Sequence, residues 1–159
     1  MTGIPIHATV VVVVEHAGRY LMTLEERGGP DGPVCYFPSG ALARGETLAE
    51  AARRETLEET GYLVEPLRVI RIEHGTFPAI PELFWWRFIV SARLVGDEPR
   101  SSTGAGVVAV EWLELDAIPG QNLRASDALQ LALSASAAGG LDIGAVVLSP
   151  QGTLEGFIA

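Results

Sequence analysis

Residues 40–62 read GALARGETLAEAARRETLEETGY and carry both a helix signal and a spaced set of acids. Thr47 and Glu50 have the spacing of a capping box, in which each side chain accepts the other residue's backbone N–H. Alanine and leucine fill the interior, and Gly61 stands where a helix commonly stops. The stretch therefore predicts a helix over 47–60.

Three glutamates near the end of this helix share one face. Because an α-helix turns once in about 3.6 residues, Glu55, Glu58 and Glu59 lie within about one turn of each other. Leu48 and Ala52 fall on the same face, so the acids continue an inward-facing apolar stripe. Such a cluster repels itself and loses hydration, a cost that divalent cations would offset. The alternative is a solvated acidic surface.

Mg²⁺ suits such a cluster because it prefers oxygen ligands and links a few carboxylates to substrate phosphates. We therefore expect Mg²⁺ as the cofactor, with Mn²⁺ as a possible substitute. Arg54 lies next to Glu55 and four residues before Glu58, where its guanidinium can orient a carboxylate. Glu46 has three possible roles: a metal ligand, a partner of Arg54, or a charge that complements the positive end of the helix.

The stretch resembles the Nudix box, whose pattern is Gly, five residues, Glu, seven residues, then Arg-Glu-apolar-any-Glu-Glu-any-Gly-apolar. The matching positions are Gly40, Glu46, Arg54, Glu55, Glu58, Glu59 and Gly61. Thr56 and Tyr62 depart mildly, since the family usually has aliphatic residues there. The His-x-Thr-Val start and the aromatic-rich segment after the box are similar to bacterial phosphatases of the NudJ type.

This resemblance implies a fold of the α/β or α+β class, an α/β/α sandwich with a central mixed β-sheet. It also implies attack of water on a phosphorus of a diphosphate linkage. Glu55, Glu58 and Glu59 would hold metal, together with the carbonyl of Gly40. We take Glu58 as the first candidate for the general base, Glu55 as a further catalytic residue and Arg54 as the group that orients them.

The identity of the general base is open, because either a box glutamate or a loop residue could hold the attacking water. Many relatives carry another acid in the loop before the strand that contains Trp112, whereas residues 103–110 contain none. The candidate substitutes are Glu82, Asp97 and Glu98.

Substrate-binding candidates lie outside the box. The candidates are Arg27, Arg44, Arg87 and Arg124, each of which can offer a guanidinium fork to phosphate oxygens. Taken singly, each is better interpreted as a solvated surface arginine, but we expect at least one of them to contact phosphate. Phe37 precedes Pro38 and is expected either to form a pocket wall or to pack in the core.

The remaining elements are expected from local patterns. Strands are expected at 7–15, 19–24, 67–73, 83–95 and 107–113, a second helix at 126–138, and a terminal hairpin from 145–149 and 153–158. We expect the strands at 67–73 and 83–95 to pair across a loop around Pro78 and Pro81. The length fits one domain over 1–159, with 139–159 as a less certain C-terminal extension.

Composition limits the class of partner. The formal charge of −9 disfavours nucleic acid polymers, while a small nucleotide or diphosphate remains compatible through bridging metals. A single cysteine fits a reducing compartment, and no apolar run reaches the roughly 20 residues of a membrane span. We expect a cytoplasmic protein that does not contact a membrane, with a homodimer possible.

The sequence therefore predicts a Mg²⁺-dependent pyrophosphohydrolase or phosphatase that acts on a nucleoside di- or triphosphate or a related nucleotide derivative. One alternative is a non-catalytic module that senses nucleotide derivatives, although such relatives usually lose box glutamates and this chain keeps them. Another is an isomerase of a prenyl diphosphate on the same fold.

Overall fold

The computed structural model describes residues 6–27, 30–100, 103–104, 106–136, 139–143, 146–148 and 154–157. The elements of this part of the chain are, in order, β1 (Ile6–His16), β2 (Arg19–Glu25), β3 (Val34–Tyr36), β4 (Ser39–Ala41), α1 (Leu48–Thr60), β5 (Val64–Phe77), β6 (Ile80–Leu94), β7 (Val107–Glu114), the 3-10 helix η1 (Leu115–Gly120), α2 (Ala128–Ser136), β8 (Leu141–Asp142), β9 (Val146–Leu148) and β10 (Leu154–Phe157).

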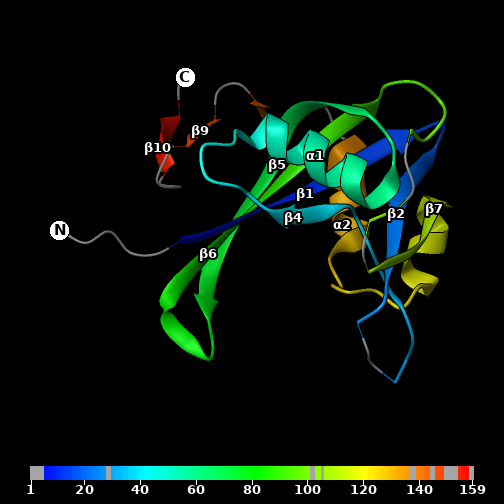
Figure 1. Ribbon diagram of the computed structural model, residues 1–159, viewed down its shortest axis with the longest axis horizontal. Helices are drawn as coiled ribbons and strands as arrows, with labels where there is room; N and C mark the ends of the chain where they lie inside the picture. Colours follow the sequence, from blue (N-terminus) through cyan, green and yellow to red (C-terminus); the bar gives the residue numbers. More distant parts are fainter. Residues whose placement is uncertain are drawn as a thin grey trace.

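Strand β1 lies at the centre of the main sheet (Figure 1). It runs parallel to β6, from the pair Ile6 and Phe84 to the pair Val14 and Ala92, and antiparallel to β2 and β4. Because the other pairings between strands of this sheet are antiparallel in the described chain, the sheet is mixed. The valines of β1 are buried, as expected for a strand covered on both faces.

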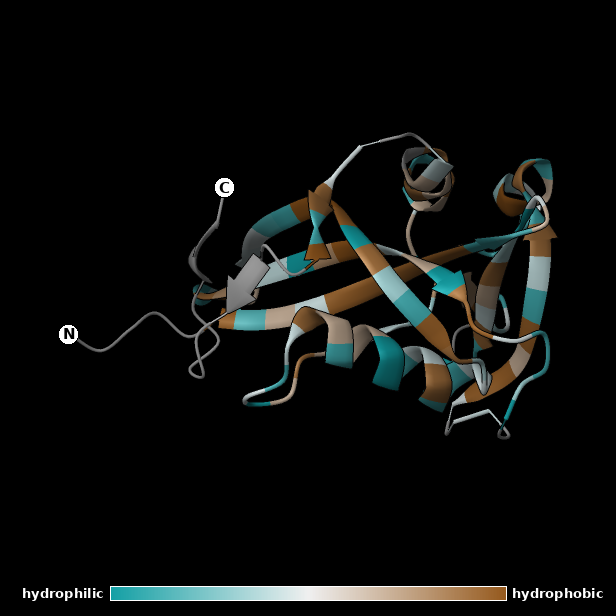
Figure 2. Ribbon diagram, turned by 90° about the horizontal axis from the view of Figure 1, so that it is seen from above, coloured by the Kyte–Doolittle hydropathy of each residue, from teal (hydrophilic) through white to brown (hydrophobic). Residues whose placement is uncertain are grey.

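Two layers of helix cover this sheet, and Figure 2 shows them on opposite sides of it. Helix α1 buries Leu48, Ala51 and Ala52 in one core with Val10, Val12 and Val14. Helix α2 and η1 belong to the other core, which contains Val11 and Val13 of β1. Alternate residues of one strand thus face the two layers, and the predicted α/β/α sandwich with a mixed sheet is confirmed.

Most predicted elements are present with shifted ends. Strands β5 and β6 form the expected hairpin, but they extend to Phe77 and Ile80, so Pro81 lies inside β6. The register shifts between Thr76 and Phe77, and such an irregularity tolerates a proline that has no N–H to donate. Helix α2 begins at Ala128, two residues after the predicted start at Ser126.

The C-terminal segment forms the expected hairpin, since β9 and β10 pair antiparallel. Strand β8 adds to the edge of the main sheet through Arg68 and Val69 of β5. Within the described residues, no helix is long and apolar enough to cross a bilayer.

Candidate active site

The segment that leads into α1 is tied to β1 by its backbone. The N–H of Val12 donates to the carbonyl of Pro38 at 2.8 Å, and the N–H of Leu42 donates to that of Ala8 at 3.0 Å. Between these bonds, β4 pairs with β1 and brings Gly40 against Glu55. A Cβ at residue 40 would lie 2.1 Å from the carboxyl carbon of Glu55, so only glycine allows this approach.

Helix α1 begins and ends as the sequence predicts. The N–H of Glu50 donates to Oγ1 of Thr47 at 3.2 Å, and the N–H of Thr47 donates to Oε2 of Glu50 at 2.8 Å. At the other end Gly61 adopts a φ of 76°, a left-handed conformation that favours glycine. These caps fix the orientation of the helix that carries the glutamates.

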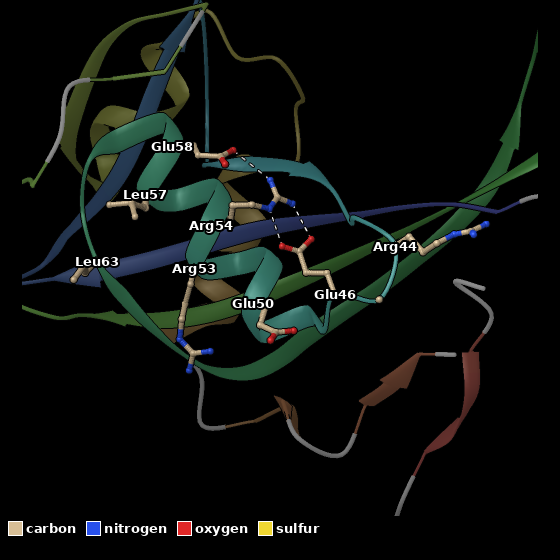
Figure 3. A pocket seen from close by; sticks show the side chains of 9 residues that line it. Arg44, Glu46, Glu50, Arg53, Arg54, Leu57, Glu58 and Leu63 are labelled. Carbon is tan, nitrogen blue, oxygen red and sulfur yellow. Dashed lines mark hydrogen bonds and ion pairs between the residues drawn. The ribbon is translucent and has the colours of Figure 1, made fainter. Parts of the chain in front are cut away.

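Arg54 connects the box residues, and Figure 3 shows its guanidinium between Glu46 and Glu58. Its Nε and Nη2 donate to the two carboxylate oxygens of Glu46 at 2.7 and 2.8 Å. Nη1 donates to Glu55 at 2.7 Å and to Glu58 at 3.3 Å. The hydrogen bond from Arg54 lowers the pKa of the Glu46 carboxyl. Of the three roles considered for Glu46, the structure shows the pairing with Arg54.

The three other glutamates do not converge in the way the helical spacing predicts. Glu55 is largely buried, whereas the side chain of Glu58 is 57% exposed, turns back to Arg54 and lines a separate depression with Arg44. Glu59 points instead toward β4, where its Oε2 accepts the N–H of Ser39 at 2.9 Å. Within the described residues, no three His, Cys, Asp or Glu side chains lie close enough together to hold a metal ion.

A cavity of about 480 Å³ opens beside Glu59. Acidic side chains line it together with guanidinium groups and backbone. The lining residues are His7, Thr9, Val11, Glu25, Arg27, Tyr36, Ser39, Gly40, Ala41, Glu59, Arg87, Arg124 and Ala125.

Glu25 is the residue of this cavity that the sequence analysis missed. It is only 9% exposed, and its Oε1 has no hydrogen-bond partner. Its Oε2 accepts Nη2 of Arg27 at 2.6 Å. The signal was present in the sequence, because Leu21, Thr23 and Glu25 alternate along β2, so that the glutamate continues a buried face.

The cavity's acids are mutually unfavourable when they are ionised. The pKa of Glu59 is raised to about 7, first by burial and then by the carboxylates of Glu25 and Glu55, while the N–H of Ser39 and the charge of Arg124 lower it. An unpartnered carboxylate oxygen on Glu25 adds to this imbalance. These oxygen donors fit a hard divalent cation, which would supply the missing positive charge.

The predicted substrate-binding residues separate into two groups. Arg27 and Arg87 line the cavity, but Arg44 lines a different, open depression with Glu50 and Arg53 on α1 (Figure 3). Phe37 is fully buried in the core beneath α2, so its prediction as a pocket wall is corrected. Its neighbour Tyr36 forms part of the wall instead.

Arg87 reaches the cavity already held by several partners. It pairs with the carboxylates of Glu73 and Asp127, and its Nη1 donates to the hydroxyl of Tyr36 at 3.1 Å. Tyr36 in turn donates to Asp127 at 3.1 Å. This network joins β3, β5, β6 and the start of α2, which gives Arg87 a structural function.

The acids suggested as substitutes for a loop carboxylate do not line this cavity. Glu82 and Glu98 are exposed, and Asp97 lies in a separate depression beside His16 and Trp112. The loop before β7 approaches α1 through backbone, since a Cβ at Gly104 would lie 2.6 Å from the carbonyl oxygen of Glu58. Within the described chain, Glu25 is the acid outside the box that lines the cavity.

The structure combines a sheet between two helical layers with a capped, glutamate-bearing helix beside a cavity. Known protein families were compared with the chain to identify this class of protein. The family model described as NUDIX domain matches residues 5–132. The chain therefore belongs to the Nudix family.

Curated relatives agree with this assignment. The chain is 34% identical over 127 residues to the mouse protein named 8-oxo-dGDP phosphatase NUDT18, covering 79% of this chain and 37% of that protein. It is 32% identical to a zebrafish oxidized purine nucleoside triphosphate hydrolase, with 76% and 74% covered. It is 31% identical to Phosphatase NudJ of Escherichia coli K12, with 74% and 75% covered. These names agree with the predicted enzyme class, a hydrolase of phosphorus anhydrides.

Solved structures show the same fold. A NUDIX hydrolase from Nitrosomonas europaea superposes with a TM-score of 0.78 at 26% identity, covering 92% of this chain and 98% of that one. The NUDIX domain of Shewanella oneidensis NrtR, solved with ADP ribose, has a TM-score of 0.60 at 17% identity, with 85% and 88% covered.

Proposed function

We propose that this chain is a Mg²⁺-dependent hydrolase that cleaves a diphosphate linkage in a nucleoside di- or triphosphate or a related nucleotide derivative. The proposal rests on one observation: carboxylates and guanidinium groups line the same cavity. Glu59 and Glu25 stand on its walls with Arg27 and Arg124, so one compartment offers sites for a cation and for phosphate oxygens.

The residues that would hold the cation are Glu55, Glu58 and Glu59, with the carbonyl of Gly40. When bound, a divalent cation would neutralise phosphate charge and acidify the attacking water. Glu58 remains our first candidate for the general base, because its exposed carboxylate can accept a proton from water. Its weak contact with Arg54, at 3.3 Å, leaves it free to turn.

Arg54 orients the acids rather than binding substrate. Its fork is occupied by Glu46, and its Nη2 also donates to the carbonyl of Ala41 at 3.0 Å. Glu55 is thereby held beside the backbone of Gly40, and a fixed ligand loses less entropy when it binds metal. We assign to Arg54 the role of positioning Glu46 and Glu55 before the substrate binds.

The test is release of phosphate and nucleotide from a panel of nucleoside di- and triphosphates, dinucleoside polyphosphates, ADP-ribose and pyrimidine diphosphates. Each is assayed with Mg²⁺, with Mn²⁺ and with chelator. We expect cation-dependent turnover that falls at least 100-fold in Glu58→Gln and in Glu55→Gln, in line with the removal of one catalytic group. The matched control is Glu114→Gln, which changes an exposed acid on β7.

Absence of turnover across the panel, with tight binding of one nucleotide derivative, would refute hydrolysis and favour the sensing module. Turnover that persists in chelator would refute the metal dependence. Equal activity of Glu58→Gln and the wild type would remove Glu58 as the general base and turn attention to Glu55 and Glu59.

A further inference from the structure

Glu25 and Arg124 form an ion pair whose contact distance is long. Nη1 of Arg124 lies 3.5 Å from Oε1 of Glu25, and this oxygen accepts no hydrogen bond. Charged pairs in good geometry approach to about 2.7–2.9 Å. A buried carboxylate oxygen without a partner is costly, so the pair is poorly satisfied in the ligand-free protein.

The backbone near Arg124 is fixed even though this contact is loose. The N–H of Arg124 donates to the carbonyl of Cys35 at 3.0 Å, and the N–H of Cys35 donates to that of Asn122 at 2.7 Å. The side chain of Asn122 donates to the carbonyl of Pro33 at 3.1 Å. The guanidinium lies over the ring of Tyr36, 5.7 Å from its centroid, so the backbone of Arg124 is fixed and its guanidinium is placed by side-chain contacts.

Arg124 also lies beside the box glutamate of the cavity. Its Nη1 donates to Oγ of Ser39 at 3.1 Å, and the N–H of the same Ser39 donates to Glu59 at 2.9 Å. A phosphate linked through a cation to Glu59 would therefore come within reach of Arg124.

We propose that Glu25 and Arg124 are an exchangeable ion pair that accepts a cation-bound diphosphate. Glu25 receives the cation at Oε1, and Arg124 leaves this carboxylate to bind a phosphoryl oxygen. The buried carboxylate of Glu25 stays paired throughout, which avoids the large cost of an isolated buried ion, while the guanidinium of Arg124, whose side chain is 37% exposed, moves at the edge of the cavity. The inference rests on the proposed function for its ligand class, and it assigns to β2 and to the segment before α2 roles that lie outside the box.

The experiment uses methylenediphosphonate, a diphosphate analogue that water does not cleave. Its binding is measured by calorimetry with and without Mg²⁺, and Mn²⁺ binding is measured separately by electron paramagnetic resonance. For Arg124→Ala we expect at least a tenfold loss of diphosphonate affinity, with Mn²⁺ affinity within twofold of the wild type. For Glu25→Gln we expect at least a fivefold loss of Mn²⁺ affinity.

Two further variants separate this exchange from a structural role. Arg124→Lys keeps the charge without the fork, and we expect an intermediate loss of diphosphonate affinity. Arg19→Ala breaks the exposed pair with Glu114, and we expect both affinities to be unchanged. Thermal melting of every sample verifies folding.

Wild-type diphosphonate affinity in Arg124→Ala would overturn the proposal. A fall of Mn²⁺ affinity in that variant equal to the fall in Glu25→Gln would also overturn it, because Arg124 would then only hold Glu25. Failure of the wild type to bind the analogue with Mg²⁺ has the same consequence. Binding with the expected variant pattern, but no turnover in the substrate panel, would refute hydrolysis and leave the exchange standing.

Discussion

Arg54 binds both carboxylate oxygens of Glu46 with parallel hydrogen bonds, at 2.7 and 2.8 Å, from a position on the helix to the loop before it. The remaining nitrogen holds Glu55 at 2.7 Å. A single planar group therefore sets the distance between the loop and the helix, and five donors in a rigid fork make arginine suited to this position.

Replacement of Arg54 by lysine tests this geometry. Lysine keeps the charge but cannot bind Glu46 with a fork and reach Glu55 together. We expect the free energy of unfolding to fall by about 1.5–3 kcal/mol, as for the loss of a hydrogen bond to a charged group. We also expect kcat to fall at least tenfold, because Glu55 loses its orientation. Urea unfolding and steady-state kinetics measure these effects, and Arg53→Lys, an exposed neighbour, is the control.

Gly40→Ala separates activity from stability. The new methyl group would meet the carboxylate of Glu55, which can swing away because it is the end of a flexible side chain. We expect the melting temperature to change little and kcat to drop at least tenfold. Gly120→Ala is the control, since a Cβ there meets no atom within 4 Å. Equal kcat in both variants would show that the close approach of Gly40 and Glu55 does not contribute to catalysis.

Arg87 is expected to matter more for folding than for binding. Arg87→Met leaves Asp127 without its cation, takes from Glu73 one of its two arginine partners, the other being Arg71, and removes a donor from Tyr36. Breaking such a partly buried pair costs about 3 kcal/mol of unfolding free energy. The control is Arg93→Met on the same strand, whose pair with Glu65 is exposed and worth at most about 1 kcal/mol. If Arg87→Met loses no more unfolding free energy than Arg93→Met, the structural role is contradicted, and Arg87 would be a substrate-binding residue instead.

The raised pKa of Cys35 leads us to expect that the free energy of unfolding falls in alkaline solution. The pKa of its thiol is raised from 9.0 to about 11, first by burial and then by the carboxylate of Glu111. Since the folded pKa is the higher one, the stabilisation is complete below pH 9 and is lost as the pH rises through about 11. We expect the wild type to lose roughly 2–3 kcal/mol more than Cys35→Ala across this window. Urea unfolding from pH 8 to pH 11 measures it, and parallel pH curves would contradict the prediction.

The sequence predicted the helix well because its signals are local. The capping box of Thr47 and Glu50 and the stop at Gly61 lie within one short segment, and the structure has all of them. Helical periodicity also placed Glu55 near the core and Arg54 near its carboxylate partners. Glu58 differed, because its side chain is 57% exposed and lies near Arg54.

The remainder of the cavity depends on long-range contacts: a local pattern can show that Glu25 is buried, but not which residues it meets. Arg124 reaches Ser39 because the segment around Leu123 lies beside Cys35 as an isolated parallel bridge. Glu25 faces the same space only because β2 pairs with both β3 and β7. Phe37 and Tyr36 are adjacent in sequence, and burial decides which of them lines the cavity.

The parallel pairing of β1 with β6 also sets an order of events during synthesis. The ribosome releases the valine-rich β1 first, and its long partner emerges only after α1 and β5 have been made. A nascent chain therefore carries an apolar strand edge that no local hairpin can cover along its full length, the type of surface that chaperones bind. Completion of β6 is the step that buries this edge, long after β1 and the box helix that packs on its valines have been made.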